Sequence, residues 1–337
     1  MNKLEIKDLC VDFHTGAGTV QAVRGVSFTL QAGRTLALVG ESGSGKSVTG
    51  RAMLGLLPGN AAARGQILYD GKNILSLSDA QMCPIRGKRI AMIFQDPMSS
   101  LNPIMRVGRQ ITEVIPLPRR QAKEKALSLL SEVGIRDPEH CFRQYPFQLS
   151  GGMRQRIVIA IALAADPEIL ICDEPTTALD VTIQSQILSL LTRLGQQRKL
   201  SVLFITHDFG VVASVADDIA VMYAGKIVEY GTAEEIFYDP KHPYTWALLS
   251  AVPDLGEKQR LYAIGGTPPN MICPPEGDAF GERNPYALRI DHQLPPPPFA
   301  VSDTHWAATW LLHPQAPKVE MPEILQQRLK KGGHYGG

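Results

Sequence analysis

The sequence predicts an α/β fold followed by a smaller, loop-rich C-terminal region. Short apolar runs such as Thr35–Val39 and Ile169–Cys172 are separated by longer stretches with helical periodicity, and proline becomes dense beyond about residue 254. Strands that alternate with amphipathic helices are typical of a sheet covered by helices. The chain has 337 residues, which is long for a single core and suits one large domain with a smaller one.

The composition is that of a globular protein. Hydrophobic residues make up 44% of the chain and charged residues 20%, and no stretch approaches the roughly 20 apolar residues that a membrane-spanning helix needs. The first residues do not resemble a signal peptide. Five scattered cysteines without a C-x-x-C pair indicate reduced thiols and a cytosolic location. A formal net charge of +1 argues against a nucleic-acid partner, since such surfaces usually carry a concentrated basic stripe.

The first half of the chain is predicted to change from strands to helices. Leu4–Lys7 and Gly25–Leu30 alternate with the period of two that is typical of half-buried strands, and Arg89–Phe94 is a further apolar run. Within Gln121–Val133 the apolar residues fall on one face of a 3.6-residue period. We therefore expect a helical subdomain over about residues 97–164.

The second half is predicted to return to a sheet. The apolar runs Ile169–Cys172 and Val202–Ile205 flank an amphipathic segment, which favours two parallel strands joined by a crossover helix. Ala220–Tyr223 and Lys226–Glu229 flank the pair Ala224-Gly225, which predicts a hairpin.

A glycine-rich loop follows the run Thr35–Val39. Gly40–Ser47 fill the pattern G-x-x-x-x-G-K-S, and Val48–Leu57 are predicted to form a helix. The glycines let successive N–H groups point into one concavity that suits phosphates, and the helix turns its positive end toward the anion. Lys46 would reach the outer phosphates, and the Ser47 hydroxyl would bind Mg²⁺. The loop therefore predicts a nucleoside triphosphate site. Its predicted contacts are Gly40, Ser42, Gly43, Ser44, Gly45, Lys46, Ser47 and Val48.

Two acidic residues end the strand predicted over Ile169–Cys172. In a phosphate-loop fold such a strand lies beside the loop strand, so its tip lies at the metal. Asp173 would hold Mg²⁺ directly or through water, and Glu174 would polarise the attacking water as a general base. Together with the loop, this pair predicts hydrolysis of the bound nucleotide.

A second anion site is predicted at Ser150–Gly152. These residues precede the apolar run Ile157–Ala164, so they begin a helix whose first N–H groups are available to an anion. By residue type alone, an ordinary capped helix start is the favoured interpretation. Two separate anion sites do suit two subunits that face each other head to tail, each nucleotide lying between one loop and the opposing turn.

The order of these motifs resembles that of the ATPase subunits of ABC transporters. The signature of that family is matched by Leu149, Ser150, Gly151, Gly152 and Met153. Asp173-Glu174 resembles its Walker B motif, and Asp180 lies where the family has its D-loop aspartate. Phe13 stands at the position of the aromatic residue that stacks on adenine in that family.

The resemblance implies a role for each matching residue. Gln95, as the Q-loop glutamine, would contact the metal or the water and report the state of the site to the membrane partner. His207, as the H-loop histidine, would touch the γ-phosphate, while Glu174 orients the water and Lys46 neutralises the phosphates. The signature residues would close the opposing site and Asp180 would couple the two sites. A single subunit should then bind ATP but hydrolyse it poorly. The predicted Mg²⁺ ligands are Ser47, Gln95 and Asp173.

Further segments are similar to the ATPases of peptide and nickel importers, namely Phe94–Pro103, Lys241–Leu249 and Gly265–Asn270. The resemblance implies a RecA-like core with an antiparallel β subdomain and a helical subdomain, together forming an ATPase domain over residues 1–254. A C-terminal region of the oligopeptide-transporter type would cover residues 255–337. The implied partners are two transmembrane permease subunits, an extracytoplasmic solute-binding protein and a second, non-identical ATPase subunit. The chain would act at the cytoplasmic face of the membrane.

One departure from that family concerns the C-terminal region. Many relatives carry four cysteines there that bind an iron–sulfur cluster, whereas here only Cys273 is in place and the other positions fall at Asn284, near Asp291 and at Thr309. One thiolate cannot hold a cluster that takes four, so we expect no cluster. The region would instead be held together by its aromatic and leucine side chains. These are Phe280, Tyr286, Phe299, Trp306, Trp310, Leu311 and Leu312.

The sequence thus predicts the ATP-hydrolysing subunit of an oligopeptide or dipeptide importer. Import of nickel, glutathione or another small solute stays open, because the ATPase never touches the solute. A soluble ABC ATPase that acts on DNA or ribosomes is disfavoured, since the chain has one cassette and no long coiled insertion. A purely regulatory nucleotide binder is disfavoured by the intact Lys46, Glu174 and His207.

Overall fold

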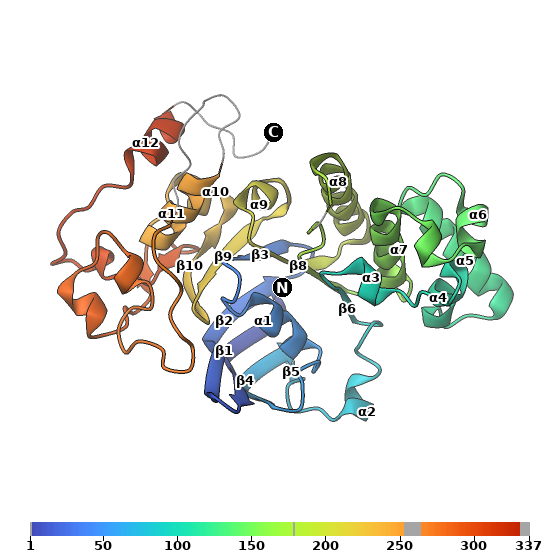
Figure 1. Cartoon of the computed structure of the whole chain (residues 1–337), viewed down its shortest axis with the longest axis horizontal. Helices are drawn as coiled ribbons and strands as arrows, with labels where there is room; N and C mark the ends of the chain where they lie inside the picture. The colour runs from blue at the N-terminus through green and yellow to red at the C-terminus, as the bar shows by residue number, and fades with distance from the viewer. Residues whose placement is uncertain (1, 178, 253–263, 331–337) are drawn as a thin grey trace. The chain divides into compact units, whose positions relative to one another are not determined.

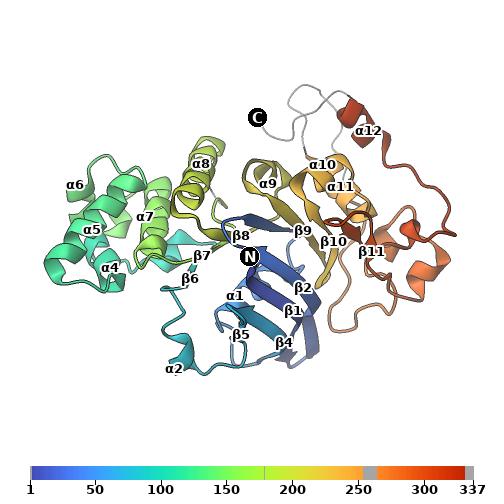
Figure 2. The same ribbon diagram turned by 180° about the vertical axis from the view of Figure 1, so that it is seen from behind.

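The computed structural model describes residues 2–177, 179–252 and 264–330. The chain divides into two compact units (Figures 1 and 2). The first unit consists of Gln31–Arg34 and Ser76–Phe204, and the second consists of Asn2–Leu30, Thr35–Leu75 and the chain from Ile205 onward. The domain boundary predicted between residues 254 and 255 lies outside the described residues and stays a prediction.

An antiparallel sheet opens the second unit (Figure 1). Its strands are β1 (Asn2–Thr15), β2 (Gly18–Gln31), β4 (Ala61–Tyr69) and β5 (Lys72–Asn73), in the order β2-β1-β4-β5. Toward the end of β2 every second residue is buried, because one face of the strand packs on the core while the other meets solvent. The strands predicted from period-two alternation are therefore confirmed.

The same unit contains a second group of strands that carries the phosphate loop. β3 (Thr35–Val39) pairs in parallel with β9 (Asp218–Tyr223), and β9 pairs with β10 (Lys226–Thr232) across the predicted hairpin. Two short strands of the C-terminal region, β12 (Trp306–Ala307) and β11 (Phe299–Ala300), extend this group beyond β10. The C-terminal region is therefore bonded through its backbone to β10, the second strand of the hairpin.

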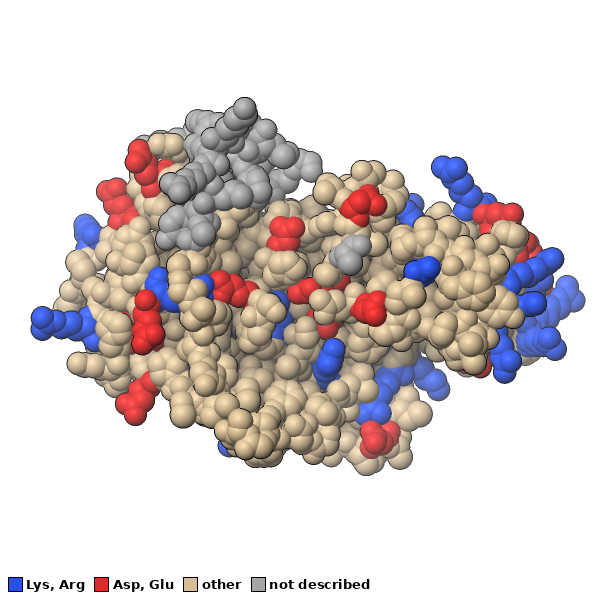
Figure 3. All heavy atoms as spheres, viewed as in Figure 1, with Lys and Arg blue, Asp and Glu red and all other residues tan. Residues whose placement is uncertain are grey.

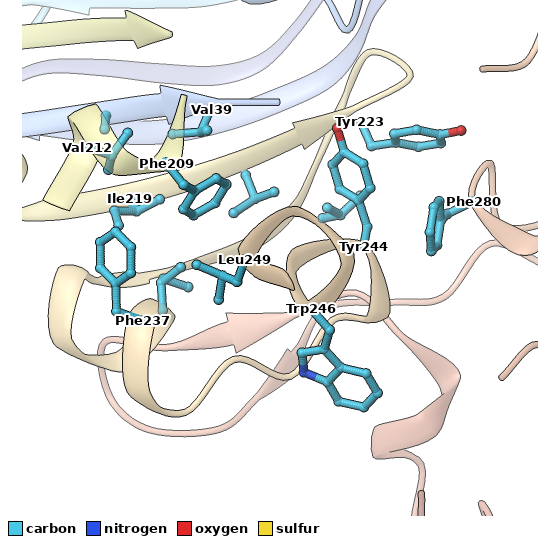
Figure 4. Close-up of a cluster of buried hydrophobic side chains, with 14 of the residues drawn as sticks. Val39, Phe209, Val212, Ile219, Tyr223, Phe237, Tyr244, Trp246, Leu249 and Phe280 are labelled. Atoms are coloured by element: carbon cyan, nitrogen blue, oxygen red, sulfur yellow. The ribbon is translucent and has the colours of Figure 1, made fainter. Parts of the chain in front are cut away.

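Helices pack on β3 and β9 to form one hydrophobic core (Figure 4). They are α9 (Phe209–Val215), α10 (Ala233–Tyr238), α11 (Pro243–Ala251) and α12 (Glu323–Lys330). Phe280 belongs to the same core, with its ring centroid 5.3 Å from that of Tyr223 and 5.2 Å from that of Tyr244. The described residues before position 253 and after position 263 thus share one core.

The aromatic residues of the C-terminal region pack differently from the sequence expectation. Phe280 lies against Tyr223 and Tyr244, Tyr286 lies against Trp246, and Trp306 stacks on Tyr230. Within the region itself, Phe299 and Trp310 pack on each other, with ring centroids 6.1 Å apart. The reason is physical: elements as short as two to four residues cannot bury a core among themselves, so their large side chains use that of the larger sheet.

A buried acid–base pair fixes the C-terminal region to β10. Glu229 is fully buried, and its Oε1 lies 2.9 Å from Nε2 of His305, which is 2% exposed. The same carboxylate accepts hydrogen bonds from the backbone N–H groups of Lys241 and His242, at 2.5 and 3.2 Å. One acidic side chain therefore satisfies two backbone donors before α11 and a side chain some 76 residues further on.

The first unit contains a parallel pair of strands and most of the helices. β6 (Ile90–Ile93) pairs in parallel with β7 (Ile169–Asp173), and β8 (Ser201–Thr206) follows β7 in the strand order. The helix α8 (Val181–Arg198) connects β7 and β8, as the crossover pattern predicts. The residues for which a helical subdomain is predicted form five helices. They are α3 (Pro97–Ser100), α4 (Val107–Val114), α5 (Arg119–Glu132), α6 (Pro138–Arg143) and α7 (Gly151–Leu163).

The remaining short elements are α2 (Asp79–Met82) and the 3-10 turns Pro146–Gln148, Gly281–Arg283, Arg289–His292 and Trp310–Leu312. Among the described residues, no helix combines the length and the apolar character that crossing a membrane requires.

Charged side chains of both signs are interspersed on the face shown in Figure 3. Two basic residues of α5 are paired with acids: Arg120 with Glu124 at 3.2 Å, and Lys123 with Glu139 at 3.7 Å. Such exposed pairs contribute little to stability, but they lower the local excess of positive charge.

The buried His242 makes the stability of the second unit depend on pH. Its Nδ1 accepts the N–H of Tyr244 at the start of α11, and burial lowers the pKa of the imidazole from 6.5 to about 3. As pH falls below 6.5, the imidazole of His242 takes up a proton in the unfolded chain but stays neutral in the folded chain. The free energy of unfolding therefore decreases until the pH reaches about 3.

We predict that His242→Asn removes this acid sensitivity, since the Asn side chain can still cap α11 but does not titrate. Between pH 6.5 and 5 the wild type should lose about 1.6 kcal/mol more than the variant, because the unfolded imidazole is half protonated at pH 6.5 and one proton per pH unit corresponds to about 1.36 kcal/mol. Urea unfolding at the two pH values measures the difference. Equal losses in both proteins would contradict the assignment of this proton to His242.

Candidate functional site

The loop Gly40–Ser47 joins β3 to helix α1 (Lys46–Met53) and packs closely against neighbouring strands. A Cβ added at Gly40 would lie 2.0 Å from the carbonyl oxygen of Met222 on β9, and one added at Gly45 would lie 2.4 Å from that of Ala22 on β2. Gly45 also has a φ of +102°. Only glycine fits these two positions, because any side chain would displace backbone.

Positive charge and helix N–H groups are concentrated at this loop. Gly45 is the N-cap of α1 and supplies no side-chain acceptor for the first N–H groups of the helix. The Nζ of Lys46, which is 4% exposed, donates to the carbonyl oxygens of Gly40 and Glu41 at 2.7 and 2.8 Å and lies 3.4 Å from the Oγ of Ser44. An uncapped helix start with a buried ammonium group fits a polyphosphate.

The other predicted loop contacts differ in exposure. Ser42 and Gly43 are exposed, whereas Ser47 and Val48 are half-buried. Helix α1 ends at Met53, earlier than the predicted end at Leu57, because Leu54 caps it and Gly55 adopts a φ of +61°.

In the first unit, the structure brings Gln95 and Glu174 together. The parallel register aligns Ile93 of β6 with Cys172 of β7, so the two polar residues each lie two positions beyond the aligned pair. The Nε2 of Gln95 donates to the Oε2 of Glu174 at 3.0 Å, and the Oγ1 of Thr177 donates to the same oxygen at 2.9 Å. The predicted general base is thus oriented by two hydrogen bonds.

Glu174 also has an unusual backbone conformation. Its φ is +47°, in the left-handed region that non-glycine residues rarely adopt. Such strain costs about 1–3 kcal/mol and is found most often where function fixes a side chain. The preceding Asp173 closes β7 and is 1% exposed. Burial, together with the charge of Asp173, raises the pKa of the neighbouring Cys172 thiol, which is an unreactive core residue.

The predicted magnesium ligands come from both units. Ser47 belongs to the second unit, while Gln95 and Asp173 belong to the first. Hydroxyl, amide and carboxylate oxygens are the donors that Mg²⁺ prefers, so the residue types fit the metal. That these three residues bind one Mg²⁺ ion together stays a prediction.

The Ser150 turn begins α7 as expected. The Oγ of Ser150 accepts the N–H of Met153 at 3.4 Å, and Leu149 before it is buried. A Cβ at Gly152 would lie 2.8 Å from the Cγ2 of Ile183 on α8, so the small residue permits close packing of the two helices. Asp180 has a structural role as the N-cap of α8, since its Oδ1 accepts the N–H of Ile183 at 2.9 Å.

The remaining predicted residues lie at the ends or edges of strands. His207 is exposed and directly follows β8. Phe13 is half-buried on β1, opposite Ala61 of β4. Their contacts with a nucleotide stay predictions.

The cysteine positions of the C-terminal region do not fit an iron–sulfur cluster. Cys273 is exposed, whereas Asn284, Asp291 and Thr309 are buried and accept backbone hydrogen bonds from Tyr286, Leu288 and Leu311. In the described part of the chain, no group of three or more His, Cys, Asp or Glu side chains could hold a metal. The absence of a cluster stays a prediction.

Some residues that contact the site have no signal in the sequence. Thr177 bonds to Glu174, and Glu41 within the loop is bonded to Tyr244 and Arg283. Glu41 occupies a variable position of the loop pattern, so only the fold reveals these contacts.

Comparison with known proteins agrees with this geometry. Residues 23–177 match the ABC transporter family, and residues 228–290 match the oligopeptide/dipeptide transporter C-terminal region. The bacterial ABC transporter cassette MJ0796, solved as a dimer, superposes with a TM-score of 0.61 at 25% identity and covers 68% of this chain and 98% of its own. A structure of the same cassette in a post-hydrolysis state, bound to ADP and phosphate, superposes equally well. The fold and the loop thus define an ATPase cassette of the ABC type.

The similarity to peptide-transport subunits extends over the whole chain. The oligopeptide transport ATP-binding protein OppD of Bacillus subtilis is 57% identical and covers 97% of this chain and 94% of its own. The dipeptide transport ATP-binding protein DppD of Lactococcus lactis is 55% identical and covers 97% and 96%. The chain therefore belongs to the family of oligopeptide and dipeptide transport ATP-binding proteins, and the predicted family and fold class are confirmed.

Gly45→Ala should impair nucleotide binding more than Gly43→Ala. Left-handed backbone costs an alanine about 1–2 kcal/mol at either position, but only at Gly45 would the new Cβ meet backbone, since Gly43 has no atom within 4 Å. ATP titration and thermal unfolding of both variants measure the difference. Equal affinities in the two would show that the close packing at Gly45 is not required.

Proposed function

We propose that this chain is the ATP-hydrolysing subunit of an ABC importer for oligopeptides or dipeptides. The hydrogen bond from Gln95 to Glu174 at the ends of two parallel strands is the observation that supports catalysis most directly. It orients the carboxylate of Glu174, which supports the proposed role of this residue as the general base for water. The names of the 55–57% identical relatives support peptides as the solute.

Each residue of the site has a proposed part in the reaction. Lys46 and the N–H groups of α1 hold the β- and γ-phosphates of ATP, and His207 stabilises charge on the γ-phosphate in the transition state. Glu174 accepts the proton of the attacking water, with Gln95 and Thr177 fixing its orientation.

Magnesium would be held by Ser47, Asp173 and Gln95. When bound, the ion would neutralise charge on the phosphates, and these side chains would hold it. Phe13 would stack on the adenine ring.

The site requires a second ATPase subunit. The signature turn, Leu149–Met153, would close the nucleotide site of the opposing subunit, with the N–H groups of α7 facing the γ-phosphate. We propose a non-identical homologue as this partner, two permease subunits as the membrane anchor and a solute-binding protein outside the membrane. The chain would then be peripheral, at the cytoplasmic face.

Glu174→Gln should retain ATP binding and reduce steady-state hydrolysis by about 10²-fold or more, because the amide cannot accept the proton from water. ATP affinity and phosphate release of the purified complex measure the two effects. Glu139→Gln, at an exposed position of α6, is the matched control and should behave like wild type. Turnover near that of wild type in Glu174→Gln would refute the assignment of the base.

Reconstitution tests the solute. The chain, its partner ATPase and the permease subunits are placed in vesicles with the solute-binding protein, and phosphate release is followed with different cargoes. Stimulation by a peptide-loaded binding protein is the expected result. Stimulation by nickel or glutathione instead would contradict peptide import while leaving the ATPase role intact.

A further inference from the structure

Two residues from outside the phosphate loop form hydrogen bonds with its second residue, Glu41. The backbone N–H of Glu41 donates to the hydroxyl of Tyr244 on α11 at 2.8 Å. Its carboxylate accepts two hydrogen bonds from the guanidinium of Arg283, at 2.7 and 2.9 Å. Both partners lie more than 200 residues further along the chain, and Arg283 belongs to the C-terminal region.

Further hydrogen bonds fix the side chain of Arg283 in place. Its side chain is 6% exposed, and its Nε donates to the carbonyl oxygen of Gly265 at 2.8 Å. One of its terminal nitrogens also donates to the hydroxyl of Tyr223 at 3.1 Å. The hydrogen bonds to Glu41 raise the pKa of the guanidinium further above its ordinary value. A bidentate, largely buried ion pair of this kind has a defined geometry, unlike an exposed ion pair.

Glu41 is also connected to the lysine of the loop. Its carbonyl oxygen accepts a hydrogen bond from the Nζ of Lys46 at 2.8 Å, so the position of Glu41 bears on the position of the ammonium group. The loop otherwise contains glycines with positive φ at residues 40, 43 and 45, which leave its backbone many alternative shapes. A flexible loop must lose that freedom when phosphate binds, unless it is already held in the binding shape.

We infer that Arg283 is a positioning residue of the nucleotide site, which holds Glu41 and neutralises its charge so that the phosphate loop keeps the shape that binds polyphosphate. The inference rests on the proposed ATPase function. It assigns to the C-terminal region a part in nucleotide binding, through residues of this chain alone.

Arg283→Gln should raise the Kd of MgATP about tenfold, the scale expected when charge-assisted hydrogen bonds favour one loop shape. The variant leaves the Glu41 carboxylate unpaired beside the phosphates and also frees the loop. The KM for ATP should rise in parallel, whereas kcat at saturating ATP should stay close to that of wild type, since Arg283 does not touch the reacting atoms. Calorimetric titration of the full chain with MgATP measures Kd.

Further variants separate the contact from general loss of structure. Glu41→Gln should weaken binding less than Arg283→Gln, because the charge that it leaves unpaired is the positive charge of Arg283, which does not repel the phosphates, and the double variant should bind like Glu41→Gln alone. Arg283→Lys keeps the charge but not the bidentate geometry, and should bind ATP with intermediate affinity. Arg289→Gln, at an exposed position of the same region, is the matched control and should bind like wild type.

Values of Kd within twofold of wild type for both Arg283→Gln and Glu41→Gln would overturn the inference. Additive losses in the double variant would overturn it as well, because they would mean that the two residues act separately. If Arg283→Gln does not fold, the comparison of Glu41→Gln with wild type decides. Failure of the wild-type complex to hydrolyse ATP would instead contradict the proposed function, while the Kd comparison would still test Arg283.

Discussion

The close approach of the phosphate loop to strands β2 and β9 is the constraint on which the second unit depends. Gly40 and Gly45 leave no room for a side chain against Met222 and Ala22, and the N–H of Gly225 donates to the carbonyl oxygen of Ser44 at 3.0 Å. Residues of β9 also belong to the hydrophobic core that contains α11 and Phe280. The loop and the C-terminal region therefore pack against the same strand. A substitution in that core is therefore expected to alter the nucleotide site as well.

In the first unit, the corresponding constraint is the parallel register of β6 and β7. This register sets Gln95 opposite Glu174, and the left-handed backbone of Glu174 directs its carboxylate to two hydrogen-bond donors. The carboxylate of the proposed base is thus already oriented by hydrogen bonds, which is how an enzyme avoids reorganising during the reaction. The Ser150 turn has a separate role, since its helix start is completed by a facing subunit in the proposed arrangement.

Local patterns predicted most of the fold, because strands, caps and tight turns depend on residues within a few positions of one another. The strand Thr35–Val39, the Ser150 cap and the hairpin at Ala224-Gly225 are examples. The pairing of Arg283 with Glu41 across 242 residues could not be predicted in this way. Nor could the packing of Phe280 and Trp306 on the larger sheet, since their aromatic character gives no partner. The joint placement of Ser47 and Asp173 stays a prediction.

In the proposed arrangement, one chain supplies half of each hydrolytic site. The rate of ATP hydrolysis per chain, measured at increasing protein concentration together with the partner ATPase, tests this most directly. We expect ATP binding by the chain alone, and a rate per chain that rises with concentration and then levels off as the subunits associate. A full rate per chain that is independent of concentration, in a protein shown to be monomeric, would contradict it.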